Sequence, residues 1–172
     1  MLVILIFGAS HTGKTNFAQK LLEKYKFPYL SLDHLKMGLI RSGNTELTPE
    51  DDEKLTEYLW PIAREIVKTA IENNQNLIVE GCYIPFDWKK DFSPEYLSAI
   101  REYCLVMTED YMRRNFRDIQ RYSNIIEWRA EGFIDIDALA KENINNLELC
   151  KKFGTNAIII DEKYSVDADI WQ

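Results

Sequence analysis

Hydrophobic positions along the chain gather into five short apolar runs separated by longer stretches of mixed polarity. The runs have the length of strands, and they show little alternation of apolar and polar residues. Continuous apolar character of this kind is typical of strands that are covered on both faces of a sheet. The predicted strands cover Leu2 to Ile6, Pro28 to Leu32, Leu77 to Gly81, Tyr103 to Met107 and Ala157 to Ile160.

The stretches between these runs carry apolar residues at intervals of three and four, which predicts helices. Strands that alternate with helices form βαβ units, so the pattern predicts an α/β fold with a parallel sheet. We expect helices over Asn16 to Lys24, Asp33 to Ile40, Pro49 to about Glu72 and Asp135 to Phe153, a further helix from Ser93, and a long one from Thr108. Ligands of such sheets bind beyond the carboxyl ends of the strands.

The segment from Gly8 to Thr15 lies between the first strand and the first helix and fits the pattern G-x-x-x-x-G-K-[ST]. Glycine at both ends allows the backbone to curl around an anion, and the start of the helix adds its positive dipole. Lys14 can then reach the β and γ phosphates, and the Thr15 hydroxyl can bind Mg²⁺. The alternative is an ordinary glycine turn before a helix. The predicted nucleotide-binding residues are Gly8, Ala9, Ser10, His11, Thr12, Gly13, Lys14 and Thr15.

Composition places this loop in an ordinary globular chain of 172 residues, a length that suits one domain. No apolar run reaches the roughly twenty residues of a membrane span, and we expect a cytoplasmic protein. The net charge of -7 argues against broad contact with nucleic acid or an anionic membrane. The three cysteines are too few and too scattered for a disulfide framework or a zinc site. Whether the protein is a monomer or a homodimer stays open.

Two acids end predicted strands at the edge where ligands bind. Glu80 follows the third strand and can hold Mg²⁺, directly or through water; the alternative is a solvated strand end. Asp33 follows the second strand and can accept the proton of an acceptor hydroxyl, although it can also serve as a helix N-cap.

Residues near Asp33 and after the third strand form a candidate acceptor site. Lys36 and Arg41 can grip an anionic acceptor or simply be solvated, and a lone histidine such as His34 has many uses. Tyr83, in an aromatic loop, can line the acceptor pocket or cover the core. The acids from Glu46 to Glu57 are expected to form a solvated helix start.

Four arginines follow the fourth strand, at spacings that place them on one side of the predicted long helix. Guanidinium groups there can stabilise charge on a transferred phosphoryl group, with Arg114 and Arg117 as catalytic candidates and Arg113 and Arg121 as nucleotide-binding ones. Surface pairing with Glu109, Asp110 and Asp118 is the alternative.

With these motifs the chain resembles the small P-loop kinases, the adenylate kinase and shikimate kinase group, and also zeta-toxin-like and 2-phosphoglycerate-kinase-like phosphotransferases. The resemblance implies a three-layer α/β/α P-loop NTPase fold with five parallel strands in the order 2-3-1-4-5. It implies ATP and Mg²⁺ as cofactors, an acceptor-binding region over about residues 33–73 and a short lid over about 113–133. Lys14, Thr15 and Asp33 map to the family's lysine, magnesium-binding hydroxyl and acid after the second strand.

The chain departs from adenylate kinases after the third strand. Those enzymes carry Asp-Gly-Phe-Pro-Arg, whose arginine binds the acceptor's phosphate, whereas this chain has Glu80-Gly81-Cys82-Tyr83-Ile84-Pro85. We therefore expect an ATP-dependent kinase that phosphorylates a hydroxyl of a small molecule. A nucleoside monophosphate kinase and a non-catalytic ATP-binding regulatory module are the alternatives.

Overall fold

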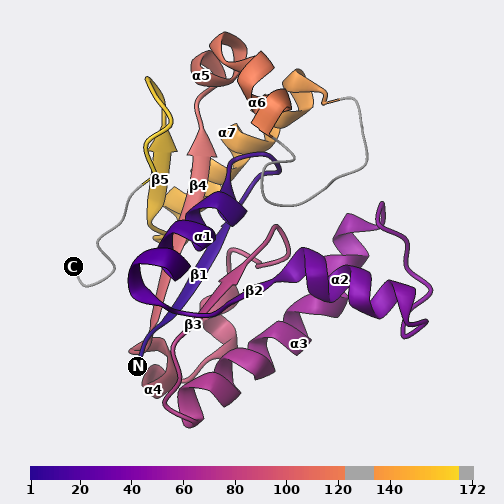
Figure 1. Ribbon diagram of the computed structural model, residues 1–172, viewed down its shortest axis with the longest axis vertical. Helices are drawn as coiled ribbons and strands as arrows, with labels where there is room; N and C mark the ends of the chain where they lie inside the picture. Colours follow the sequence, from indigo (N-terminus) through magenta and orange to yellow (C-terminus); the bar gives the residue numbers. More distant parts are fainter. Residues whose placement is uncertain (123–133, 167–172) are drawn as a thin grey trace.

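A computed structural model describes residues 1–122 and 134–166 and contains one five-stranded parallel sheet (Figure 1). Its order is β2-β3-β1-β4-β5, and each neighbouring pair of strands runs parallel. The predicted order is confirmed, and the sheet with helices on both faces is the P-loop NTPase fold. The strands are β1 (Val3–Gly8), β2 (Tyr29–Ser31), β3 (Leu77–Glu80), β4 (Ile100–Met107) and β5 (Ala157–Ile160).

Helices cover the two faces of the sheet because alternate residues of β1 point to opposite sides. Ile4 and Ile6 pack in one core cluster with Phe17 of α1. Val3 and Leu5 pack in a second cluster that includes the buried face of α3. The helices are α1 (Lys14–Tyr25), α2 (Leu32–Arg41), α3 (Asp52–Glu72), α4 (Pro94–Leu97), α5 (Glu109–Arg114), α6 (Phe116–Tyr122) and α7 (Ile136–Phe153), with the short 3-10 helix η1 (Trp88–Asp91).

Two predicted helices differ from the observed ones. The helix expected from Pro49 begins at Asp52, because the Thr48 backbone N–H and hydroxyl both donate to Asp51 Oδ2, each at 2.9 Å, and close a turn first. The long helix expected from Thr108 is wrong: Asn115 divides it into α5 and α6. The Asn115 side chain donates to the Tyr111 carbonyl at 2.9 Å, which ends α5.

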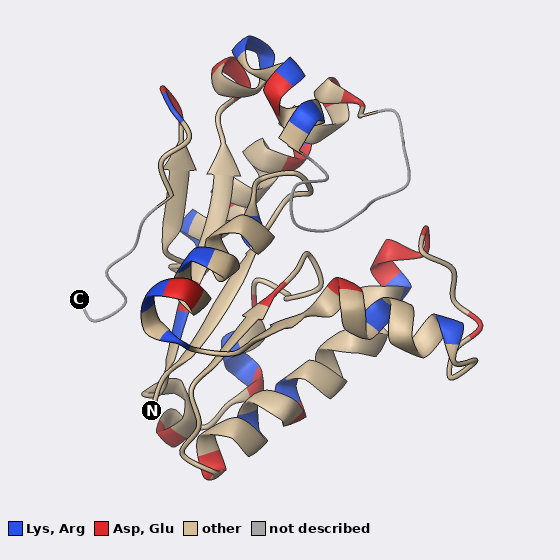
Figure 2. Ribbon diagram, in the orientation of Figure 1, with Lys and Arg blue, Asp and Glu red and all other residues tan. Residues whose placement is uncertain are grey.

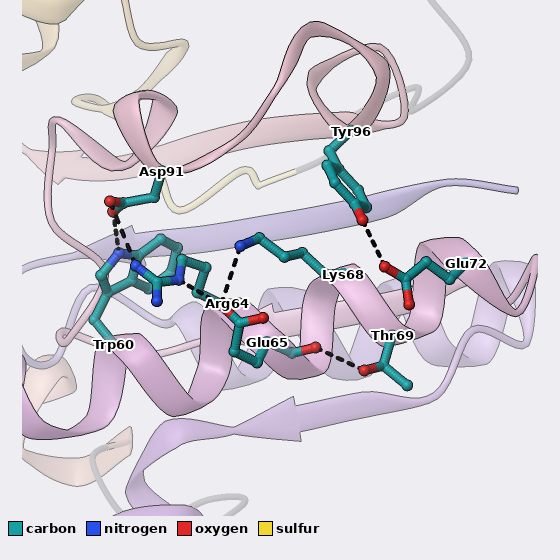
Figure 3. A network of polar contacts seen from close by, with 8 residues as sticks. All are labelled: Trp60, Arg64, Glu65, Lys68, Thr69, Glu72, Asp91 and Tyr96. Carbon is teal, nitrogen blue, oxygen red and sulfur yellow. Dashed lines mark hydrogen bonds and ion pairs between the residues drawn. The ribbon is translucent and has the colours of Figure 1, made fainter.

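A network of polar contacts fixes α3 to the segment after β3 (Figure 3). The Trp60 indole N–H donates to Asp91 at 2.8 Å, and Arg64 lies 3.5 Å from the same carboxylate. One and two turns further along, Lys68 pairs with Glu65 at 3.0 Å and Tyr96 of α4 donates to Glu72 at 2.5 Å. The network holds α3 in place beside the sheet, and the first residue of that helix contributes to the candidate site described next.

Buried polar and thiol groups also tie α7 to β4. Asn143 is fully buried; its carbonyl oxygen accepts the Met107 backbone N–H at 2.8 Å and its amide donates to Leu139 at 2.9 Å. Cys104 is buried in the core, and its hydrogen bond with Cys150 together with burial raises its pKa. These contacts set the position of α7 relative to the end of β4. Within the described ranges, no helix is both long enough and apolar enough to cross a membrane.

Candidate active site

The loop from Gly8 to Thr15 follows β1 directly and has a backbone that requires glycine at both ends. Gly8 has φ +130°, and a Cβ added there would lie 2.3 Å from the Leu105 carbonyl oxygen. Gly13 has φ +85°, and its Cβ would lie 2.1 Å from the Tyr164 hydroxyl. Between them His11 adopts φ 61°, a left-handed conformation that non-glycine residues seldom take. Such a curled loop before a helix turns backbone N–H groups toward a common point, as in phosphate-binding loops.

Two side chains of the loop are bonded to one backbone carbonyl. The Lys14 ammonium donates to the Ala9 carbonyl oxygen at 2.7 Å, and the Thr12 hydroxyl donates to the same oxygen at 2.8 Å. Both residues are buried, with 5% of Lys14 exposed. The ammonium is therefore held within the loop, where phosphate oxygens can take the place of the Ala9 oxygen as its acceptors.

The two predicted magnesium-binding residues lie next to each other. The Thr15 hydroxyl is 3.4 Å from Glu80 Oε2, although the residues come from α1 and β3. Neighbouring ligands of an octahedral Mg²⁺ are roughly 3 Å apart, given metal–oxygen distances of about 2.1 Å. This pair of oxygens therefore fits Mg²⁺ coordination at the mouth of the loop. Water can supply the remaining ligands, as is usual for this ion.

Asp33 lies in the first turn of α2, and the alternative that it caps this helix is wrong because the N-cap residue is Ser31. Its carboxylate forms an ion pair with Lys36 at 3.0 Å. The same ammonium donates to the Tyr83 hydroxyl at 2.8 Å, and that hydroxyl donates to Asp52 at 3.1 Å. We call these four residues, Asp33, Lys36, Tyr83 and Asp52, the Lys36 cluster. It joins α2, the loop after β3 and the start of α3.

The environment of the cluster shifts two pKa values. Burial raises the pKa of Tyr83 to about 12, against an opposing effect of the Lys36 charge. For Lys36, burial alone lowers the pKa, but the hydrogen bond with Tyr83 and the charge of Asp33 outweigh it and raise the pKa above its ordinary value. Lys36 is therefore a protonated, partly buried cation at neutral pH, and Asp33 is its counter-ion.

Two other predicted acceptor-site residues are exposed. His34 is exposed on α2, and Arg41 is exposed in the last turn of the same helix. Lys36 and Tyr83 thus meet, whereas His34 and Arg41 face solvent.

The expectation that four arginines share one side of a single helix is wrong, because α5 ends before Arg117. Arg113 pairs with Glu109 at 2.8 Å and with Asp137 at 2.6 Å. Arg114 donates to the Asp161 backbone oxygen at 3.2 Å. Arg117 and Arg121 are exposed on α6. Figure 2 shows acidic and basic positions close together on α5 and α6. Positions 123–133 of the predicted lid lie outside the described residues.

Sequence reasoning missed three residues near the loop. Asp52 is predicted to belong to a solvated helix start, yet it accepts the hydrogen bond from Tyr83. Glu142 of α7 is exposed on part of its surface; burial of the remainder raises its pKa, the charge of Lys14 lowers it and that of Asp52 raises it. The Tyr164 hydroxyl donates to the Gly13 carbonyl at 3.2 Å. Tyr164 follows the last strand, and ligands of parallel sheets bind beyond the carboxyl ends of the strands, so its position was a signal that could have identified it.

Comparison with known proteins supports the fold. No protein-family model matches the chain, and no match is found among the sequences of curated proteins. Solved structures do match. A Chloroflexus aurantiacus protein provisionally assigned as a kinase has a TM-score of 0.61 and 19% identity, over 96% of this chain and 91% of its own. Shikimate kinase from Bacteroides thetaiotaomicron has a TM-score of 0.53 and 18% identity, over 99% and 91%. A gluconokinase from Sinorhizobium meliloti has a TM-score of 0.51 and 13% identity, over 93% and 82%.

The chain therefore has the fold of the small P-loop kinases. The similarity extends over 82% to 91% of the length of each of these proteins. At these sequence identities the comparison establishes the architecture; the chemistry must be argued from the residues of this chain.

Proposed function

We propose that the protein is an ATP- and Mg²⁺-dependent kinase that transfers the γ-phosphoryl group to a hydroxyl of a small molecule. The observation that carries the proposal is the arrangement at the carboxyl ends of β1, β2 and β3. The curled glycine loop with its enclosed lysine follows β1, and the ion-paired Asp33 follows β2. Between these strands lies β3, which ends at Glu80, the partner of Thr15 in the hydroxyl–carboxylate pair suited to Mg²⁺. Phosphoryl transfer needs these functions: a phosphate cradle, charge neutralisation and orientation of the acceptor.

Each residue of the site has a proposed role. Lys14 binds the β and γ phosphates, and Thr15 and Glu80 hold Mg²⁺, which when bound neutralises charge on these phosphates. Asp33 accepts the proton of the acceptor hydroxyl, whose oxygen forms the new bond to the γ phosphorus while the bond to the β–γ bridging oxygen breaks and ADP leaves. Arg114 and Arg117 stay candidates for stabilising the transferred group. Residues 33–73 form the proposed acceptor region and 113–133 the proposed lid.

The nucleoside monophosphate alternative has less support from this site. In the described structure the segment directly after β3 presents Cys82 and Tyr83, and the Tyr83 hydroxyl is bonded to Lys36 and Asp52. These two residues offer a thiol and a hydroxyl, and the cation bonded to that hydroxyl, Lys36, is already paired with Asp33, whereas a nucleotide acceptor requires a cation to bind its phosphate.

Lys14→Ala and Asp33→Asn test the two halves of the proposal. Lys14→Ala should weaken Mg²⁺–ATP binding at least tenfold in calorimetry, because it removes the cation within the loop. Asp33→Asn should leave ATP affinity within about twofold and lower kcat for ADP release with an acceptor by 10²-fold or more, the usual contribution of a general base. Unchanged ATP affinity in Lys14→Ala would refute the nucleotide site, and unchanged kcat in Asp33→Asn would refute the role of Asp33.

A further inference from the structure

The Lys36 cluster bears on which acceptor the site takes, an inference that rests on the proposed kinase function. Lys36 is the described cation nearest in sequence to Asp33, and its charge is neutralised by that carboxylate at 3.0 Å. A second of its three N–H donors is taken by the Tyr83 hydroxyl at 2.8 Å. The Lys36 ammonium also lies over the Tyr83 ring, 5.1 Å from its centroid. These three contacts and the partial burial of Lys36 fix the ammonium within the protein.

An anionic acceptor that used Lys36 would have to compete with Asp33. Breaking this pair would leave the Asp33 carboxylate without its counter-ion beside the incoming anion, which is unfavourable. It would also remove a positive charge that favours the ionised form of Asp33, the form that can accept a proton. Lys36 is thus suited to orient Asp33 and poorly suited to bind substrate anions.

Among the described residues, the further charged group in the Lys36 cluster, bonded through Tyr83, is an acid. Asp52, the first residue of α3, accepts a hydrogen bond from the Tyr83 hydroxyl at 3.1 Å. On α5, Arg113 is paired with Glu109 and Asp137, and Arg114 is bonded to the Asp161 backbone oxygen. Carboxylates and hydroxyls of this kind bind sugar hydroxyls or ammonium groups by accepting hydrogen bonds from them.

We infer that the acceptor is an uncharged or cationic polyhydroxyl compound, such as a sugar, polyol or amino sugar, and that Lys36 is a positioning residue for Asp33. Carboxylate- and phosphate-bearing acceptors are disfavoured because the space next to Asp33 presents Asp52, Tyr83 and an already neutralised Lys36. Lys36, which holds the general base Asp33, and the nearby acid Asp52 therefore determine the class of acceptor.

The first experiment measures ADP release from Mg²⁺–ATP with acceptors matched in framework and differing in charge. The hexose series is glucose, glucosamine, gluconate and glucose 6-phosphate; ribose, ribonate and ribose 5-phosphate, and inositol and its monophosphate, extend it. We expect the best neutral or amino acceptor to exceed every acidic one at least tenfold in kcat/KM. An acidic member that exceeds its neutral partner overturns the inference.

The second experiment separates the role of Lys36 from acceptor binding. With the best acceptor, Lys36→Gln should lower kcat at least tenfold, change KM less than threefold and move the acidic limb of the kcat–pH profile to higher pH, because Asp33 loses its counter-ion. A tenfold rise in KM with kcat and the pH profile unchanged would show that Lys36 binds the acceptor, and would overturn its role as a positioning residue. Lys151→Gln, which alters an exposed lysine in the last turn of α7 outside the proposed acceptor region and lid, is the control and should change neither parameter.

The two proposals can fail separately. If Mg²⁺–ATP binds in a Lys14-dependent manner but no neutral or amino compound of the panel is phosphorylated, the acceptor class inferred here is wrong and the nucleotide site stands. If Mg²⁺–ATP does not bind at all, the proposed function fails, and the inference that rests on it fails as well.

Discussion

Gly8 stands at the position where β1 ends and the phosphate loop begins, and two independent constraints act on it. Its φ of +130° is open to glycine alone, and any Cβ would overlap the Leu105 carbonyl of the neighbouring strand β4. We expect Gly8→Ala to lower the free energy of unfolding by about 2 kcal/mol or more, because both the dihedral and the backbone contact must be distorted. Urea denaturation measures this change.

A matched glycine on α2 provides the control. Gly38 has open space around its Cβ position and lies inside a helix. Gly38→Ala should therefore raise the free energy of unfolding by roughly 0.5 to 1 kcal/mol, the difference between alanine and glycine in a helix. If both substitutions have the same effect, the close approach of Gly8 to Leu105 is not the reason for glycine at this position.

Tyr83 gives the stability of the protein a dependence on alkaline pH. Burial raises its pKa from 10.0 to about 12, so between these values the unfolded chain loses the phenolic proton while the folded protein keeps it. The unfolded state then binds fewer protons, and stability must fall as pH rises through this window. Between pH 9 and pH 11 the wild type should lose about 1 kcal/mol more than Tyr83→Phe, measured by urea denaturation at each pH. Parallel pH profiles of the two proteins would contradict the shifted pKa.

At the scale of elements, α3 is held in place by polar contacts as well as by its apolar face. Its apolar face packs on the sheet, while Trp60 and Arg64 both reach Asp91 of η1 (Figure 3). Because Asp91 lies after the next strand, its partnership with α3 depends on the folded chain and has no signature in the spacing of either segment.

Removing the Asp91 carboxylate should therefore loosen α3. Asp91→Ala leaves the largely buried indole N–H of Trp60 without its acceptor, and we expect a loss of about 1 to 3 kcal/mol in the free energy of unfolding. Asp87→Ala removes a more exposed acid of the same segment, which pairs with Lys90, and should change stability by less than about 0.5 kcal/mol. Equal losses in the two variants would show that the network of Figure 3 does not stabilise α3.

For the whole molecule, ligand binding and folding are linked because the proposed nucleotide site joins β1, α1 and the distant strand β3. Mg²⁺–ATP at about 100 times its Kd should stabilise the folded state by roughly 2.7 kcal/mol, which corresponds to about 5 to 10 °C in Tm for a chain of this size. Differential scanning calorimetry with and without the nucleotide measures the shift. In Lys14→Ala the same ligand concentration should produce a much smaller shift, and an undiminished one would place ATP elsewhere on the protein.

The sequence by itself determined the sheet and the loop, because both are encoded locally. Five apolar runs with helical segments between them specify parallel strands, and the spacing of Gly8, Gly13, Lys14 and Thr15 reflects a turn whose dihedrals few other residues permit. Resemblance to the small P-loop kinases then supplied the strand order that the structure confirms.

Tertiary structure decided what the polar side chains near the loop contact. Lys36 is paired with Asp33 and held by Tyr83, which comes from another element. Tyr83 also donates to Asp52, and Tyr164 donates to Gly13. The contacts made by Tyr83 and Tyr164 join residues far apart in the sequence. The interruption of the arginine helix at Asn115 had a local cause: its side-chain amide and its backbone N–H both donate to the Tyr111 carbonyl. Apolar periodicity nevertheless continued through this position. Periodicity reports which face of an element is buried, whereas polar partners are selected only when separate elements meet.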